Sequence, residues 1–225
     1  MIIAIDGPSG AGKSTLGKML AKRLGLLYLD TGAMYRAVAV SALHNGVSFE
    51  DAGGLTRAAE AAKIDLVGEP GALRVILDGN DVTAEIRTVE VAQAASVAST
   101  VSGVRQAMVN QQRQIGNSAA NGCVLEGRDI GSVVFPNADF KFFLTAKPEA
   151  RARRRFEEDK AKGLVSTYEE TLAQINQRDE RDVSRTDSPL VIADEAIVID
   201  SSELDLTEVF EQMLSAVREK TNAAA

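Results

Sequence analysis

The feature that most constrains this chain is a glycine-rich turn near its start. Residues 7–14 read Gly-Pro-Ser-Gly-Ala-Gly-Lys-Ser and match the pattern G-x-x-x-x-G-K-[ST] at every defined position. An apolar run at residues 2–5 precedes the turn, and apolar residues at helical spacing follow it to residue 24. A strand, a glycine turn and a helix in this order form the context in which this pattern binds phosphate. The sequence therefore predicts a P-loop.

The residue types in this turn have chemical reasons. Glycines let backbone N–H groups close around phosphate oxygens, and the N-terminus of the following helix adds positive potential. Lys13 is expected to reach the β- and γ-phosphates of ATP, and the Ser14 hydroxyl is the expected ligand of Mg²⁺. The predicted ATP-binding residues are Gly7, Pro8, Ser9, Gly10, Ala11, Gly12, Lys13, Ser14 and Thr15.

Apolar runs separated by turns predict an α/β fold. Strand, helix, strand and helix follow one another, which is typical of a parallel sheet flanked by helices. Strands are expected at residues 2–5, 26–29, 123–125, 140–144 and 196–199, and helices at residues 13–24, 31–43, 89–115, 148 onward, 168–182 and 206–220. Between residues 63 and 87 two further strand-like segments, 64–67 and 73–77, flank a Gly/Pro turn and predict a small antiparallel insertion.

Charge and composition narrow the class of partner. A formal net charge of −7 argues against general nucleic-acid binding, which needs a basic surface. No apolar run approaches the ~18 residues of a membrane span. The single cysteine, Cys123, rules out a disulfide within the chain and fits a reducing compartment. We therefore expect a cytoplasmic protein with neither nucleic-acid nor membrane partners, and Cys123 is expected to serve only core packing.

The P-loop by itself leaves several classes open. A GTPase should also carry N-K-x-D, which is absent, and the D-x-x-G match at residues 51–54 lies in an expected polar loop. A mechanical ATPase would place an acidic residue after an apolar strand, and Glu126 is the nearest candidate. A regulatory protein that binds nucleotide without turnover remains an alternative. His44, the only histidine, is expected at a helix end with a surface or capping role.

Clustered arginines favour an enzyme that brings two polyanions together. Guanidinium groups grip phosphate with two hydrogen bonds, so such an enzyme needs several of them around one cleft. Residues 151–155 contain four arginines, whose alternative role is a solvated helix face with acidic partners at i,i+4. Arg178, Arg181, Asp182 and Arg185 would share one face of a continuing helix. These segments are expected to form a mobile lid and its return helix.

Several stretches in the expected order resemble bacterial cytidylate kinases, of the nucleoside monophosphate kinase group. The resemblance spans nearly the whole chain and is far more specific than the P-loop. The matching stretches are Ile5-Asp6-Gly7-Pro8-Ser9-Gly10-Ala11-Gly12-Lys13, Leu29-Asp30-Thr31-Gly32-Ala33-Met34-Tyr35-Arg36, Glu85-Ile86-Arg87-Thr88, Glu126-Gly127-Arg128-Asp129-Ile130-Gly131 and Arg178-Asp179-Glu180-Arg181-Asp182.

This resemblance implies roles for individual residues. The acceptor CMP would be bound by Thr31, Tyr35, Arg36, Ser96, Arg105, Arg128, Asp129, Asp182 and Arg185, and catalysis would depend on Lys13, Arg128, Arg154 and Arg181. Within the acceptor set, Arg36 and Arg128 would grip the phosphate. Cytosine presents an amino donor at N4 and acceptors at N3 and O2, and Asp129 with Arg105 and Ser96 supplies the complementary groups.

Two positions depart from the family pattern. Thr31 stands where serine is frequent but keeps the hydroxyl, and Ser14 stands where glycine is common, so Thr15 is the alternative neighbour of Mg²⁺.

The reaction that the resemblance implies is ATP + CMP = ADP + CDP, with dCMP as a further acceptor. A kinase for UMP is the alternative within enzymes.

The resemblance also implies the architecture. We expect one P-loop three-layer fold, a monomer, with a parallel core sheet (about residues 1–35, 117–147 and 186–225), a monophosphate-binding insertion (about 36–116) and a helical lid (about 148–185).

Overall fold

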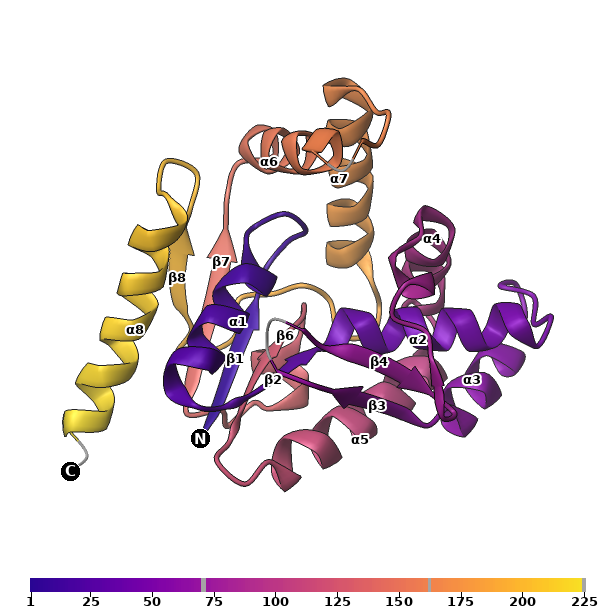
Figure 1. The fold of residues 1–225 in the computed structure, drawn as a ribbon, viewed down its shortest axis with the longest axis horizontal. Helices are drawn as coiled ribbons and strands as arrows, with labels where there is room; N and C mark the ends of the chain where they lie inside the picture. Colours follow the sequence, from indigo (N-terminus) through magenta and orange to yellow (C-terminus); the bar gives the residue numbers. More distant parts are fainter. Residues whose placement is uncertain (70–71, 162, 224–225) are drawn as a thin grey trace.

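The computed structural model describes residues 1–69, 72–161 and 163–223, and it contains a five-stranded parallel sheet in the order β2-β6-β1-β7-β8 (Figure 1). Its strands are β1 (Ile2–Asp6), β2 (Leu27–Asp30), β6 (Cys123–Glu126), β7 (Phe140–Thr145) and β8 (Ile197–Asp200). Strands buried on both faces appear in a sequence as short continuous apolar runs. All five predicted core strands are confirmed, with bounds that differ by at most one residue at either end.

The register of the sheet brings acidic residues together at one end. Asp30 of β2 lies opposite Glu126 of β6, which in turn lies opposite Ile5, and Asp6 follows Ile5 at the end of β1. In open parallel sheets, ligands bind beyond the carboxyl ends of the strands. The loops that follow β1, β2 and β6 are therefore the places to look for a site.

Helices cover both faces of the sheet and make the three-layer fold that was predicted. One face packs on α1 and α8 through a cluster that includes Ile3, Leu16 and Met213, and the other packs on α2 and α5 through Leu29, Met34 and other residues. The helices are α1 (Lys13–Leu24), α2 (Thr31–His44), α3 (Ala52–Ala61), α4 (Val89–Ala98), α5 (Ser102–Ser118), α6 (Pro148–Ala161), α7 (Tyr168–Ser184) and α8 (Leu206–Ala223).

The inserted antiparallel sheet is confirmed. It contains β3 (Ile64–Val67), β4 (Arg74–Leu77) and β5 (Asn80–Asp81). Asp78 and Gly79 between β4 and β5 both have positive φ, as a tight hairpin turn requires. Short 3₁₀ and π turns, η1 (Glu85–Arg87) and η2 (Ile130–Val134), complete the elements.

Helix α3 was not predicted from the sequence. The stretch expected to be a polar loop begins this helix, and the Asp51 carboxylate caps it by accepting a hydrogen bond from the Gly54 N–H at 2.9 Å. Two glycines in its first turn lower its helix propensity, which tertiary packing of Leu55 and Ala59 overrides. The D-x-x-G match is thus a helix start.

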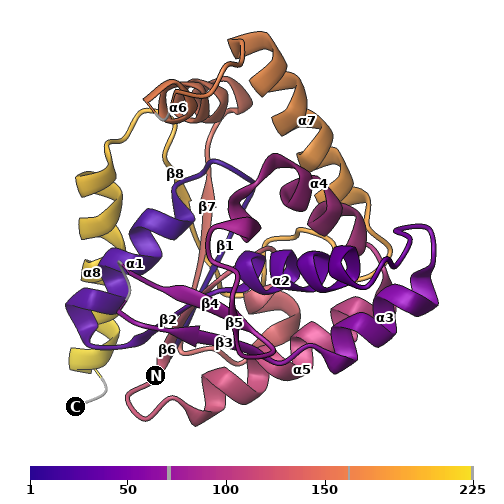
Figure 2. The same cartoon turned by 45° about the vertical axis from the view of Figure 1, so that its right-hand side comes forward.

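Helices α6 and α7 pack against each other above the carboxyl ends of the strands, over the turn between β1 and α1 (Figures 1 and 2). Helix α7 begins with a capping box in which the Thr167 and Glu170 side chains satisfy each other's backbone N–H groups. The predicted arginine-bearing helix from Pro148 and the following helix are confirmed. Within the described part of the chain, no helix combines the length and apolarity that a membrane span requires.

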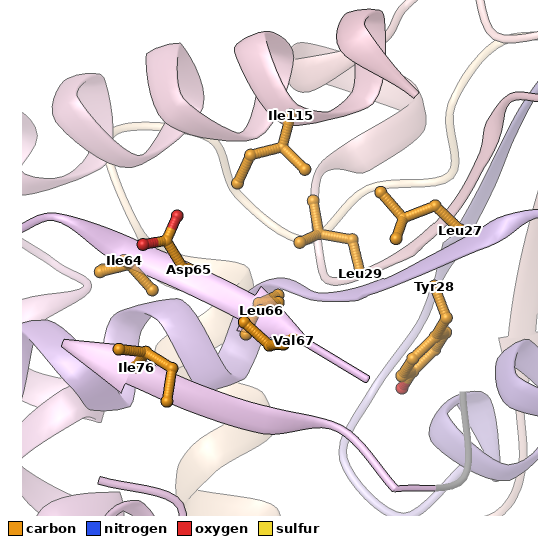
Figure 3. Close-up of a pocket in the computed structure, with 9 residues that line it drawn as sticks. All are labelled: Leu27, Tyr28, Leu29, Ile64, Asp65, Leu66, Val67, Ile76 and Ile115. Carbon is orange, nitrogen blue, oxygen red and sulfur yellow. The ribbon is translucent and has the colours of Figure 1, made fainter. Parts of the chain in front are cut away.

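A pocket of about 300 Å³ separates the edge strand β2 from the antiparallel sheet (Figure 3). Its lining is largely apolar and comes from both sheets and from α5: Leu27, Tyr28, Leu29, Ile64, Asp65, Leu66, Val67, Ile76 and Ile115. Strands β2 and β3 are edge strands of their own sheets, so backbone hydrogen bonds do not join the two sheets here.

Candidate active site

The glycine turn after β1 has the backbone conformation of a phosphate-binding loop. Gly7, Gly10 and Gly12 have φ values of 143°, 77° and 89°, which favour glycine. A Cβ atom on Gly7 would lie 1.9 Å from the Leu144 carbonyl oxygen, so no larger residue fits without movement of the backbone. The turn leads directly into the N-terminus of α1, as a phosphate cradle requires.

Lys13 is folded across this turn. Its ammonium group donates a hydrogen bond to the Pro8 carbonyl oxygen at 2.6 Å, and the residue is buried. Burial, and next the positive charge of Arg128, lower the pKa of Lys13 to about 7, while Glu126 and Asp6 oppose this shift. An anion placed in the turn would favour the charged form of this lysine.

Ser14 and Glu126 offer oxygen atoms beside Lys13. Ser14 is exposed at the start of α1. Burial, and next the charge of Asp30, raise the pKa of the Glu126 carboxyl, while Lys13 and the Ser14 hydroxyl oppose this. The Tyr28 hydroxyl also donates a hydrogen bond to the Glu126 carboxylate. Hydroxyl and carboxylate oxygens are ligands that suit Mg²⁺, so these residues fit the ion. Among the residues that the structure describes, no group of three or more His, Cys, Asp or Glu forms a metal cluster.

The first turns of α2 carry the predicted acceptor residues Thr31, Tyr35 and Arg36. The Thr31 hydroxyl donates to the Glu126 carbonyl oxygen at 2.6 Å, which joins α2 to the end of β6. Arg36 pairs with Asp30 at 2.9 Å and remains partly exposed. The Arg105 guanidinium lies 5.6 Å from the centre of the Tyr35 ring, close enough for a cation–π contact.

Arg105 of α5 and Asp129 form a buried ion pair, with side chains only 4% and 7% exposed. A second bond runs from Arg105 to the Ser99 carbonyl oxygen at 3.1 Å. The Arg105 Nε is buried and has no hydrogen-bond partner among the residues that the structure describes. A buried donor of this kind is costly unless something accepts from it, which points to a polar ligand at this place.

Arg128, Asp182 and Arg185 form a second charged cluster. Arg128 Nε donates to Asp182 at 2.7 Å, and Arg185 approaches the other Asp182 oxygen at 3.3 Å. Burial would raise the pKa of Asp182, but the two arginines outweigh it and hold this pKa below its ordinary value. Helix α7 ends at Ser184, so the prediction that Arg185 continues the helical face was wrong, although Arg185 still reaches Asp182.

Other residues of α7 face the same region. Arg181 donates to the Ser96 hydroxyl at 2.5 Å and so links α7 to α4. Burial and the positive charge of Arg128 lower the pKa of Arg178 to about 10. The positive charges of Arg128 and Arg178 repel each other, and a polyanion bound between them would stabilise the charged form of both. Arg178 belongs to the predicted arginine cluster but was not predicted as a site residue.

The arginines of α6 have different environments. Arg151 is buried, donates to the carbonyl oxygens of Ala146 and Ser9 at 2.8 and 3.0 Å, and pairs with Asp179 of α7 at 2.6 Å. Arg154 lies against Ser201, just after β8, and donates to its hydroxyl at 3.1 Å and to its carbonyl oxygen. Arg151 therefore contacts the P-loop, whereas Arg154 binds the backbone and hydroxyl of Ser201 just beyond the carboxyl end of β8.

The two residues expected to have no chemistry lie outside this site. His44 ends α2 and is exposed, and its Nε2 lies 2.7 Å from the Glu85 carboxylate. Cys123 is completely buried in β6, as its predicted packing role requires. Burial raises the pKa of its thiol to about 12, which makes it unreactive.

A parallel α/β sheet with a P-loop after β1, and arginines gathered opposite it, defines a P-loop phosphotransferase. One solved structure, an uncharacterized protein from Eubacterium ventriosum, shares the fold with a TM-score of 0.52 at 14% identity, covering 97% of this chain and 98% of that one.

The sequence comparisons identify the family. The cytidylate kinase family model matches residues 3–219, so the chain belongs to the cytidylate kinase family. A cytidylate kinase from Geobacter sp. strain M21 is 49% identical over 98% of this chain and 94% of the relative. Another, from Caldanaerobacter subterraneus subsp. tengcongensis, is 49% identical over 97% of this chain and 95% of the relative.

Proposed function

We propose that this protein transfers the γ-phosphoryl group of ATP to CMP, giving ADP and CDP, and that dCMP is a second acceptor. Family membership over residues 3–219 supports the reaction class and the acceptor. The structural observation that carries the proposal is the pair of successive residues Arg128 and Asp129. They follow β6, whose carboxyl end adjoins the P-loop, and they offer a phosphate-binding cation and a buried carboxylate side by side.

The donor ATP would occupy the P-loop, with its phosphates over the backbone N–H groups and against Lys13. Mg²⁺, held by Ser14 with Glu126 nearby and Thr15 as the alternative, would neutralise charge on the phosphate oxygens when bound. Phosphoryl transfer depends mainly on the alignment of the two substrates and on positive charge around the transferred group. An oxygen of the acceptor phosphate forms a bond to the γ-phosphorus as the bond to ADP breaks, and Lys13, Arg128 and Arg178 supply charge around it.

The acceptor would lie between α2, α4, α5 and α7. Arg36 and Arg128 would bind its phosphate, and Asp182 with Arg185 would meet the ribose. Asp129, held by Arg105, would accept a hydrogen bond from the cytosine N4 amino group. Uracil presents an acceptor at that position, so the fixed carboxylate disfavours UMP.

An ADP-release assay over a panel of nucleoside monophosphates tests this function. CMP and dCMP are expected to give the highest kcat/KM, and UMP a lower value. A preference for UMP would overturn the proposed acceptor. Nucleotide binding without any turnover would overturn the enzyme and leave a regulatory nucleotide-binding protein. We also propose that the protein is a cytoplasmic monomer, and light scattering after gel filtration tests its oligomeric state.

A further inference from the structure

Asp6 connects two segments that are far apart in the sequence. It is the last residue of β1, immediately before the P-loop, and it is 3% exposed. Its two carboxylate oxygens accept hydrogen bonds from the backbone N–H groups of Ile130 at 2.8 Å and Gly131 at 2.7 Å. These are the first two residues of η2, the short turn that directly follows Arg128 and Asp129.

Asp129 stands at the position where a helix is normally capped. An aspartate there usually accepts a hydrogen bond from the backbone N–H two or three residues later. The Asp129 side chain makes no such bond, and its carboxylate pairs with Arg105 instead. Gly131, one of the residues that it would otherwise cap, already donates its N–H to Asp6.

We propose that Asp6 is a positioning residue of the acceptor site, because it caps η2 from the neighbouring strand, so that the Asp129 carboxylate can pair with Arg105 and face the base instead of capping its own helix. This inference rests on the proposed function of Asp129. It extends that function to a residue outside the set proposed to bind either nucleotide.

The charge and placement of Asp6 suit this role. Burial raises its pKa to about 6, the amides of Gly131 and Ile130 and the charge of Lys13 oppose this, and Asp129 adds to it. At pH 8 the group is therefore an anion that accepts from both amides. Because Asp6 directly precedes Gly7, the first residue of the P-loop, the cap also ties the acceptor turn to the P-loop.

The substitution Asp6→Asn tests the proposal at pH 8. The asparagine has the same shape but only one accepting oxygen, and its NH₂ group faces the second amide. Asp129 is then expected to turn toward its own helix. We expect the KM for CMP to rise about tenfold and the CMP-over-UMP ratio of kcat/KM to fall by a similar factor. The KM for ATP should change less than about twofold.

A matched control is Asp139→Asn. Asp139 is exposed and also accepts a backbone N–H bond from β1, at Ile2 near the opposite end of that strand. This variant should keep both KM values and the selectivity of the wild type. Equal losses for CMP and UMP in Asp6→Asn, or a KM for ATP that rises as much as that for CMP, would overturn the proposal.

The double variant Asp6→Asn/Asp129→Asn distinguishes an effect of Asp6 through Asp129 from an unrelated disturbance of the site. If Asp6 acts on selectivity through Asp129, adding Asp6→Asn to Asp129→Asn should lower the CMP-over-UMP ratio no further. Independent, additive losses would overturn the proposal.

Amide hydrogen exchange supplies a readout that needs neither turnover nor a folded Asp6 variant. In Asp129→Ala, the amides of Ile130 and Gly131 should remain as protected as in the wild type, because Asp6 caps them. Loss of their protection would overturn the assignment. If the wild type does not turn over CMP, the proposed function is wrong. The exchange experiment still decides whether Asp6 is the cap of η2.

Discussion

Lys13 is the side chain on which turnover should depend most directly. Its ammonium group lies across the P-loop and donates a hydrogen bond to the Pro8 carbonyl oxygen. Lys13→Ala is expected to lower kcat by ~10²–10³-fold, because a pre-organised charge at the transferring group is lost, while CMP binding persists. Steady-state kinetics and calorimetric CMP titration measure the two effects. Lys22→Ala, an exposed lysine of the same helix, is the control. Wild-type kcat in Lys13→Ala would refute the P-loop role.

Asp129 is the residue expected to read the base. In Asp129→Asn the charged acceptor opposite the cytosine N4 group is lost, and the new amide donates to uracil O4. A misplaced buried polar pair costs roughly 1–3 kcal/mol, so the CMP-over-UMP ratio of kcat/KM should fall by about 5- to 150-fold. Asp65→Asn, on the exposed side of β3, should leave the ratio unchanged. If Asp129→Asn also leaves it unchanged, Asp129 does not recognise the base.

The titration of Asp6 should appear in the stability of the protein. Burial raises its pKa from 3.8 to about 6, against the amides of Gly131 and Ile130. Between these values the folded protein holds a proton that the unfolded chain has released, so this contribution to stability is lost as the pH rises. The unfolding free energy of the wild type relative to Asp6→Asn should fall by about 3 kcal/mol from pH 3.5 to 7.

Urea unfolding of both proteins across this pH range measures the difference. The charge of Asp129 raises the pKa of Asp6 and that of Lys13 lowers it, and both residues are present in the two proteins. A difference that does not vary with pH would show that Asp6 does not titrate in this window.

At the scale of elements, Arg151 joins α6, the P-loop and α7. Its guanidinium satisfies two carbonyl oxygens and the Asp179 carboxylate. Arg151→Met should lower the free energy of unfolding by about 1–3 kcal/mol, because these partners lose their donor in a mostly buried place. Arg155→Met is the matched control, since Arg155 is half exposed and, among the residues that the structure describes, forms an ion pair only with Asp159 in the next turn. It should cost at most ~0.5 kcal/mol.

Urea denaturation of the two variants measures these costs. Equal midpoints would mean that the contacts of Arg151 add nothing to stability, and that this arginine is better assigned to substrate binding. A raised KM for ATP in Arg151→Met, with the KM for CMP unchanged, would further support its placement against Ser9 of the P-loop.

At the scale of the whole molecule, the two substrates should close the site in two steps. Part of the acceptor site lies on the inserted region and on α7, whereas the P-loop and the pair Arg128 and Asp129 belong to the core. A pocket between β2 and β3 leaves room for movement (Figure 3). A site that transfers a phosphoryl group must exclude water. We expect CMP to draw the insertion toward the core, and an unreactive ATP analogue to draw in the lid.

Energy transfer between dyes on introduced cysteines measures this closure. Exposed positions are available at Glu60 on α3, Glu157 on α6 and Glu211 on α8, and the buried thiol of Cys123 should not compete for the dye. CMP should shorten the Glu60–Glu211 distance, and the ATP analogue the Glu157–Glu211 distance. If neither distance changes, the insertion is a rigid wall of the pocket and the two-step closure is wrong.

The sequence by itself determined the features that depend on neighbours along the chain. The P-loop follows from glycines whose backbone angles other residues disfavour, and the core strands follow from apolar runs bounded by turns. The antiparallel insertion followed from the same local signals. Helix α3 was not predicted because Gly53 and Gly54 lower the local helix propensity. In the folded protein the burial of Leu55 favours the helix.

Tertiary structure alone decided how the charged residues are paired. Asp6 caps a turn 124 residues away, Arg151 reaches Ser9, and Arg154 binds Ser201 although it lies only three residues beyond Arg151. Periodicity and residue type predict which face of an element is buried, since they act over a few neighbouring residues. The partner of a buried charge depends instead on which distant segments the packing of the sheet and helices brings within hydrogen-bonding distance.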